Sequence, residues 1–179
     1  MNKILLFIIL FIATSCAGPN PNPGERTADN NLVYGDKKLF ASLSEKHAKK
    51  GEPWALLRAG IAYDYGFGVE KDLPKAKYYL IEVTKFYKSN PSWWQSGIMI
   101  GAIGKSGFFN SNTDALLGYY HLANIFYKKN PQEALKNINF VIEHSKSQSL
   151  FFCCEFAGGL GINQEQIIAV KNKIIEHIN

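Results

Sequence analysis

Cysteine is scarce in this chain: three thiols occur among 179 residues, and two of them are the neighbours Cys153 and Cys154. Neighbouring side chains on a helix point about 100° apart, so these two thiols cannot form a bond without breaking the helix. We therefore expect no disulfide framework, with both thiols buried between helices. A strained bond between the two neighbours and an intermolecular bridge are the alternatives.

Motifs for metal, nucleotide and hydrolytic chemistry are also missing. The four histidines are scattered, and none has a His or Cys at metal-ligand spacing. The segment Ile103–Ser106 looks like the end of a phosphate-binding loop, but Met99 occupies the position of its first glycine. No Gly-x-Ser-x-Gly element occurs. We therefore predict that the chain is not an enzyme and that it uses no cofactor and no metal.

Strong charge is absent as well. The formal net charge is +5, and the lysines are dispersed through the sequence rather than clustered. Removal of residues 1–15 would take away Lys3 alone and leave +4. A nucleic-acid partner is therefore not expected.

The N-terminal apolar run is too short to cross a bilayer as a helix. Ile4–Ala13 has ten residues and follows Lys3, whereas a hydrocarbon core of ~30 Å needs about 20. This length and the positive start are typical of a secretory signal. The ending Ile12–Cys16 resembles a bacterial lipobox, which implies a signal peptide over 1–15 and acylation of Cys16. An ordinary cleaved signal, giving a secreted protein, is the alternative.

The stretch after Cys16 alternates proline with asparagine and has almost no apolar side chain. Such a sequence buries too little surface to offset the entropy of ordering. We expect residues 16–31 to form a flexible tether between a lipid-carrying Cys16 and one folded domain over 32–179. The anchor implies the bacterial cell envelope, and Ala17 after the cysteine is compatible with the outer membrane, facing the periplasm.

The most specific pattern lies between Ala55 and Val83. Ten residues fall there at a fixed spacing: Ala55, Gly60, Tyr63, Gly66, Gly68, Val69, Asp72, Lys75, Ala76 and Tyr79. This spacing resembles the Sel1-like repeat, a unit similar to tetratricopeptide repeats that builds α-solenoids. The resemblance implies a helix pair over about 54–90. Glycines in the turn at 66–69 can take positive φ, and Asp72 can cap the second helix.

A shift of 41 residues aligns a second, weaker copy of this unit. Gly60 then falls on Gly101, Gly66 on Gly107, and Asp72 on Thr113. We predict a degenerate unit over about 95–129, although Phe109 and Asn110 replace the second glycine and the valine of the turn. Helices over 131–178 follow, the last opened by a capping box at Asn163 and Gln166. The predicted fold is all-α, an α-solenoid of about eight helices.

Aromatic side chains are the candidates for partner binding, because large rings are good anchors in a solenoid groove. We expect exposed rings at Trp54, Tyr65, Trp93, Trp94 and Tyr119. The resemblance implies a lipid-anchored scaffold that binds a protein or peptide, such as an assembly factor or a pilot protein. The alternatives are an immunity protein that neutralises a toxin in the periplasm, and a cell-wall-binding or enzymatic envelope factor.

Overall fold

The computed structural model describes residues 23–88, 106–145 and 162–178, and its secondary structure in these ranges is helical. The all-α prediction is confirmed, with seven helices in the described ranges rather than about eight. Cys16, Trp93, Trp94, Gly101, Cys153 and Cys154 lie outside the described residues. The helices are α2 (Pro23–Tyr34), α3 (Lys37–Ala48), α4 (Pro53–Tyr65), α5 (Leu73–Thr84), α6 (Ser106–Phe126), α7 (Pro131–His144) and α8 (Gln164–Ile178).

Short polar side chains set where most of these helices begin. Asp36 accepts from the N–H of Lys38, and Asn130 accepts from the N–H of Glu133. At the start of α8, Asn163 and Gln166 each accept from the other's backbone N–H, at 2.8 and 2.9 Å, so the predicted capping box is confirmed. Prolines occupy the first turn of four helices, where the missing N–H costs nothing: Pro23, Pro53, Pro74 and Pro131.

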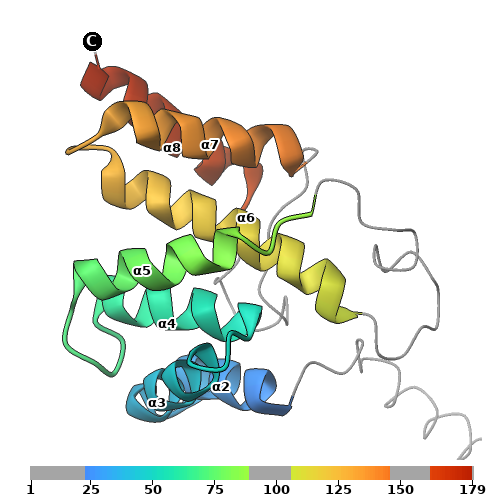
Figure 1. Cartoon of the computed structure of the whole chain (residues 1–179). Helices are drawn as coiled ribbons and strands as arrows, with labels where there is room; N and C mark the ends of the chain where they lie inside the picture. Colours follow the sequence, from blue (N-terminus) through green and yellow to red (C-terminus); the bar gives the residue numbers. More distant parts are fainter. Residues whose placement is uncertain (1–22, 89–105, 146–161, 179) are drawn as a thin grey trace, which may run out of the picture.

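The helices pack in chain order, each against the next one in the sequence where both are described (Figure 1). Helix α4 also packs against α6, which places it at the centre of the molecule. Every residue of α4 from Trp54 to Tyr63 is buried. A helix that is apolar on all sides has to be covered on all sides, and α3, α5 and α6 supply that cover.

The α4–α5 pair follows the expected geometry. Gly66 and Gly68 take φ of 75° and 74°, in the left-handed region that glycine adopts without strain. Asp72 caps α5 by accepting from the N–H of Lys75 at 3.0 Å. At Gly60 an added Cβ would lie 2.6 Å from Cγ of Leu80. Helices α4 and α5 therefore pack this closely because Gly60 has no side chain. The turn and the cap are confirmed.

The tether prediction is wrong for residues 23–31, because they belong to α2. This helix packs against α3, and its Glu25 and Asp29 are buried against Arg58 of α4. Local composition gave no sign of a helix, since the segment is polar. Tertiary contacts supply its stability: the acidic side chains bond to a guanidinium on another helix, and Ala28 and Leu32 enter the core.

The predicted turn at Gly107 and the predicted cap at Thr113 are also wrong. Both residues lie inside α6, which runs without interruption from Ser106 to Phe126. The first unit reverses direction with two glycines at positive φ, Gly66 and Gly68. Phe109 occupies the position equivalent to Gly68, and a bulky residue is strained in that conformation. The helix therefore continues where the repeat would turn.

Candidate functional site

A groove of about 850 Å³ runs between α5, α6 and α7. We call it the α5–α7 groove. Helix α6 carries Tyr119, Leu122 and Phe126 on its wall, and α5 adds Ile81 and Thr84. The α7 residues that line it are Glu133, Lys136, Asn137, Asn139, Phe140 and Glu143. The apolar residues come mainly from α5 and α6, and α7 supplies most of the polar and charged ones. A cleft that combines apolar and polar groups is suited to binding a ligand.

Aromatic rings gather along one side of this groove. The Tyr119 and Phe140 ring centroids are 4.4 Å apart, and Phe140 stacks on His144 at 4.1 Å. Tyr87 meets Phe140 edge-on, with centroids 5.0 Å apart. Packed rings are rigid and have little conformational entropy to lose when a partner binds. This makes the cluster suitable as an anchor.

Asn137 is the polar residue of the groove whose hydrogen bonding is incomplete. It is only 4% exposed, and its Nδ2 has no acceptor among the residues that the structure describes. A buried donor without a partner costs about 1–3 kcal/mol. The Nδ2 is covered by protein atoms, so a partner in the groove does not reach it as the side chain lies here.

The structure places the rings that were predicted as exposed anchors in three different settings. Tyr119 is half-buried and lines the groove. Tyr65 is 53% exposed as expected, but it packs against Phe67 and His121 rather than lining the groove. Trp54 is wrong as an exposed anchor: it is 6% exposed, and its indole N–H donates to Glu52 at 2.7 Å. Because α4 is covered on all sides, even its large amphipathic ring is buried.

The groove residues that sequence reasoning missed are Ile81, Asn137 and Phe140. Ile81 is 42% exposed on α5 despite its apolar side chain. In the sequence, Asn137 and Phe140 look like ordinary positions of an amphipathic helix. No motif marks them, because the groove is formed only when α5 and α7 pack beside α6.

A second cluster joins four charged side chains deep in the fold. Arg58 of α4 donates to Asp29 at 2.7 Å and to Glu25 at 3.1 Å, both on α2. Its Nη1 lies 3.8 Å from a carboxylate oxygen of Asp114 on α6 and donates to the carbonyl of Trp54 at 3.0 Å. The Arg58 side chain is 1% exposed, so no substrate can reach the guanidinium. The cluster connects α2, α4 and α6, and we call it the Arg58 lock.

The protonation states of this lock follow from burial and charge. Burial raises the pKa of Asp114 to about 8, although Arg58 works against that shift. Burial also raises the pKa of Glu25. Burial alone would lower the pKa of Arg58, but the carboxylate of Asp29 and the other acids raise it above its usual value. At neutral pH Arg58 is therefore charged and Asp114 carries a proton.

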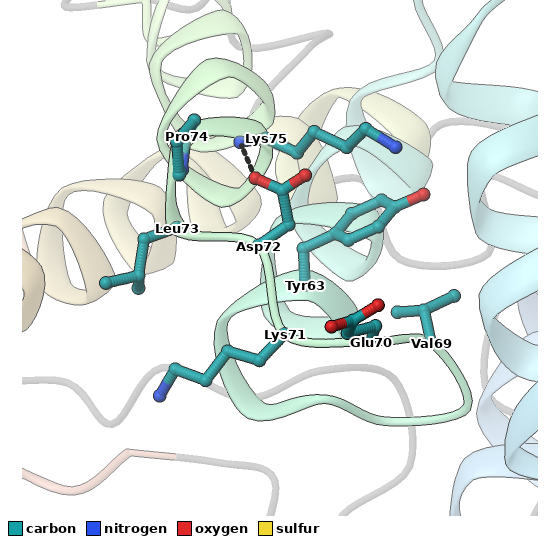
Figure 2. Close-up of a pocket in the computed structure, with 8 residues that line it drawn as sticks. All are labelled: Tyr63, Val69, Glu70, Lys71, Asp72, Leu73, Pro74 and Lys75. Carbon is teal, nitrogen blue, oxygen red and sulfur yellow. Dashed lines mark hydrogen bonds between the residues drawn. The ribbon is translucent and has the colours of Figure 1, made fainter.

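Figure 2 shows a hollow of about 880 Å³ beside the α4–α5 loop, lined by Tyr63 and residues 69–75. Asp72, the residue that caps α5 beside this hollow, already accepts a hydrogen bond from the N–H of Lys75. The Lys75 ammonium lies 4.7 Å from the centroid of Tyr63, whose ring stacks on Tyr79. Since these groups hold the turn and the helix pair together, we assign this hollow to the architecture of the α4–α5 pair.

Within the described ranges, no three His, Cys, Asp or Glu side chains are placed to hold a metal ion. Over the same residues, no helix combines the length and apolarity needed to cross a membrane. No protein-family model, no curated protein and no solved structure matches this chain.

Proposed function

We propose that this chain is a lipid-anchored interaction module of the bacterial cell envelope that binds a protein or peptide segment in the α5–α7 groove. Acylation of Cys16, inferred from the lipobox resemblance, would attach it to the membrane. The proposed architecture is a Sel1-like α-solenoid, here with one well-kept unit and a divergent remainder. Binding would be non-covalent, with the aromatic rings as anchors.

The observation that carries this proposal is the aromatic wall of the groove. Tyr119 and Phe140 line the same cleft, with ring centroids 4.4 Å apart. A peptide would supply apolar side chains to this wall and partners for the charged groups that line α7, such as Glu133 and Lys136. An exposed Ile81 on the opposite wall adds apolar area that a partner would cover.

The helix pair α4–α5 supports the proposed solenoid. Ala55 and Ala76 are fully buried at the positions where the repeat has alanine, and Tyr63 stacks on Tyr79 with ring centroids 6.0 Å apart. Small residues at these positions let neighbouring helices approach closely. Such stacks leave grooves between helices, and repeat proteins bind partners along these surfaces.

Site-specific photocrosslinking in cells tests the proposal. A photoreactive side chain at Ile81 should capture a discrete partner, because this residue lines the groove and is 42% exposed. The control is the same side chain at Ile168 of α8, which is 43% exposed and lies outside the groove. Adding Tyr119→Ala to the Ile81 variant should reduce the captured species at least 10-fold. Equal capture from both positions, or none from Ile81, would contradict the proposal.

A further inference from the structure

The outward face of α3 is rich in lysine. Phe40, Ala41, Ser44 and Ala48 are buried and turn one side of this helix to the core. The opposite side and the residues just after the helix are exposed: Lys38, Leu39, Ser42, Lys46, Lys49 and Lys50. The one acid on the flank of this side, Glu45, already accepts from the Tyr63 hydroxyl at 3.2 Å and pairs with Lys49 at 3.4 Å. We call Lys38, Lys46, Lys49 and Lys50 the lysine face.

The lysine face borders a hollow of about 510 Å³ between α3 and the α4–α5 loop. Lys38, Ser42, Glu45, Lys46 and Lys49 line it from α3 and the residue just after this helix, and Gly68 and Val69 line it from the loop. The Glu45 carboxylate is the group that pairs with Lys49. The loop is pressed onto the start of α3, since a Cβ on Gly68 would lie 1.9 Å from the carbonyl oxygen of Lys37. Ammonium groups and a hydroxyl around a fixed hollow suit a phosphate-bearing headgroup.

The lysine face lies near the end of the molecule that Cys16 precedes, and this limits which surfaces the lysine face can contact. Helices α2 and α3 are joined by two residues and run antiparallel (Figure 1). Lys46, Lys49 and Lys50 therefore lie at the end of the pair where Pro23 begins α2. Cys16 precedes Pro23 by seven residues, which span at most about 25 Å when fully extended. An acyl group on Cys16 would keep this end of the molecule close to the membrane.

We propose that the lysine face of α3 rests on the anionic phospholipid surface to which Cys16 anchors the chain. This inference depends on the proposed lipid anchor for its setting. The acyl chains of a lipoprotein would hold the chain at the membrane, and a basic patch adds attraction to anionic lipids that sets which face lies on the surface. Helix α7 lies at the opposite end of the stack from α3 (Figure 1). Docking through α3 therefore turns the α5–α7 groove away from the membrane.

Vesicle binding without the acyl group tests the lysine face by itself. The chain from position 16 onward with Cys16→Ser keeps all described helices, which lie between residues 23 and 178. It should sediment with vesicles that contain phosphatidylglycerol at low ionic strength, and not with phosphatidylcholine alone. The triple variant Lys46→Gln, Lys49→Gln, Lys50→Gln should bind about 100-fold more weakly, because each lysine near an anionic surface contributes about 5-fold. Added salt should also weaken the binding.

The matched control removes three lysines elsewhere, with Lys85→Gln, Lys129→Gln and Lys171→Gln. It has the same net charge and should lose much less binding. If both triple variants lost vesicle binding equally, net charge and not the lysine face would explain the binding, and the inference would be overturned. If the chain did not bind phosphatidylglycerol vesicles at all, the inference would also be overturned, and an acidic protein would be the next candidate partner of the lysine face. Helical circular dichroism shows that both variants are folded. Palmitate labelling of the full chain, with Cys16→Ala as control, tests the lipid anchor separately. If the wild-type chain took up no palmitate while the unacylated chain still bound the vesicles, the anchor would be contradicted and the lysine face would not.

Discussion

Among the described glycines, Gly68 is the position where an added side chain would meet the closest contact. Its φ of 74° is unfavourable for any residue with a Cβ, and that Cβ would meet the backbone of Lys37 and Lys38. Gly51 has nearly the same φ, 76°, but nothing lies within 4 Å of its added Cβ. The two glycines therefore separate conformational strain from steric contact.

We predict that Gly68→Ala lowers the free energy of unfolding by about 3 kcal/mol or more. Gly51→Ala should cost only about 1 kcal/mol, which is the strain of a left-handed alanine. Urea unfolding followed by circular dichroism measures both values. Similar losses for the two variants would mean that the α4–α5 loop does not press on α3.

Single residues also show where sequence reasoning was sufficient. Asp72, Asn163 and Gln166 were predicted as caps and act as caps. Their partners are backbone N–H groups three residues away at most, so local sequence contains the whole interaction. The prediction that Trp54 is exposed was wrong because the burial of this side chain depends on three other helices. The sequence near Trp54 does not indicate where those helices lie.

Helix α6 differs most from the element that the repeat pattern predicts. It has 21 residues and passes straight through the predicted turn. It approaches α5 at Gly118, where an added Cβ would lie 2.6 Å from a methyl group of Val83. Asn112 on α6 also bonds the backbone N–H and the carbonyl of Lys88, each at 3.0 Å. These contacts with α5 and with the segment that follows it hold the long helix in place.

Thr113→Pro distinguishes a continuous helix from a turn with a cap. Position 113 is interior to α6, where proline removes a hydrogen bond and clashes with the preceding turn. We predict a loss of about 3 kcal/mol in unfolding free energy. Thr113→Ala, which keeps the N–H, should cost less than half of that. If proline were tolerated as well as alanine, a helix start at 113 would be the better description.

The Arg58 lock makes the stability of the whole molecule depend on pH. Asp114 has an ordinary pKa of 3.8, raised to about 8 in the folded chain. A raised carboxyl pKa contributes stability that is complete below pH 3.8 and is lost as the pH rises through 8. Buried His121 has the opposite effect: its pKa falls from 6.5 to about 4, so its contribution is lost as the pH falls from 6.5 towards 4. Between pH 6.5 and 8 the contribution of His121 is nearly constant, and the contribution of Asp114 decreases.

We predict that the free energy of unfolding falls by about 1–2 kcal/mol between pH 6.5 and 8, because the unfolded chain has released the Asp114 proton that the folded chain still holds. Asp114→Asn should flatten this dependence, because an amide of the same shape cannot ionise. Urea unfolding at several pH values measures both slopes. A wild-type slope that persists in Asp114→Asn would assign the effect to another group, with the raised Glu25 as the next candidate.

The sequence by itself determined the features that depend on neighbours a few residues apart. These are the helical class, the glycine turn at 66–68 and the caps of α5 and α8. The tertiary structure decided which polar stretch becomes α2, that α6 continues through Gly107, and which aromatic rings are exposed. The physical reason is the range of the interactions. A cap is completed within one helical turn, whereas Arg58 needs carboxylates 29, 33 and 56 residues away, and the α5–α7 groove needs three packed helices.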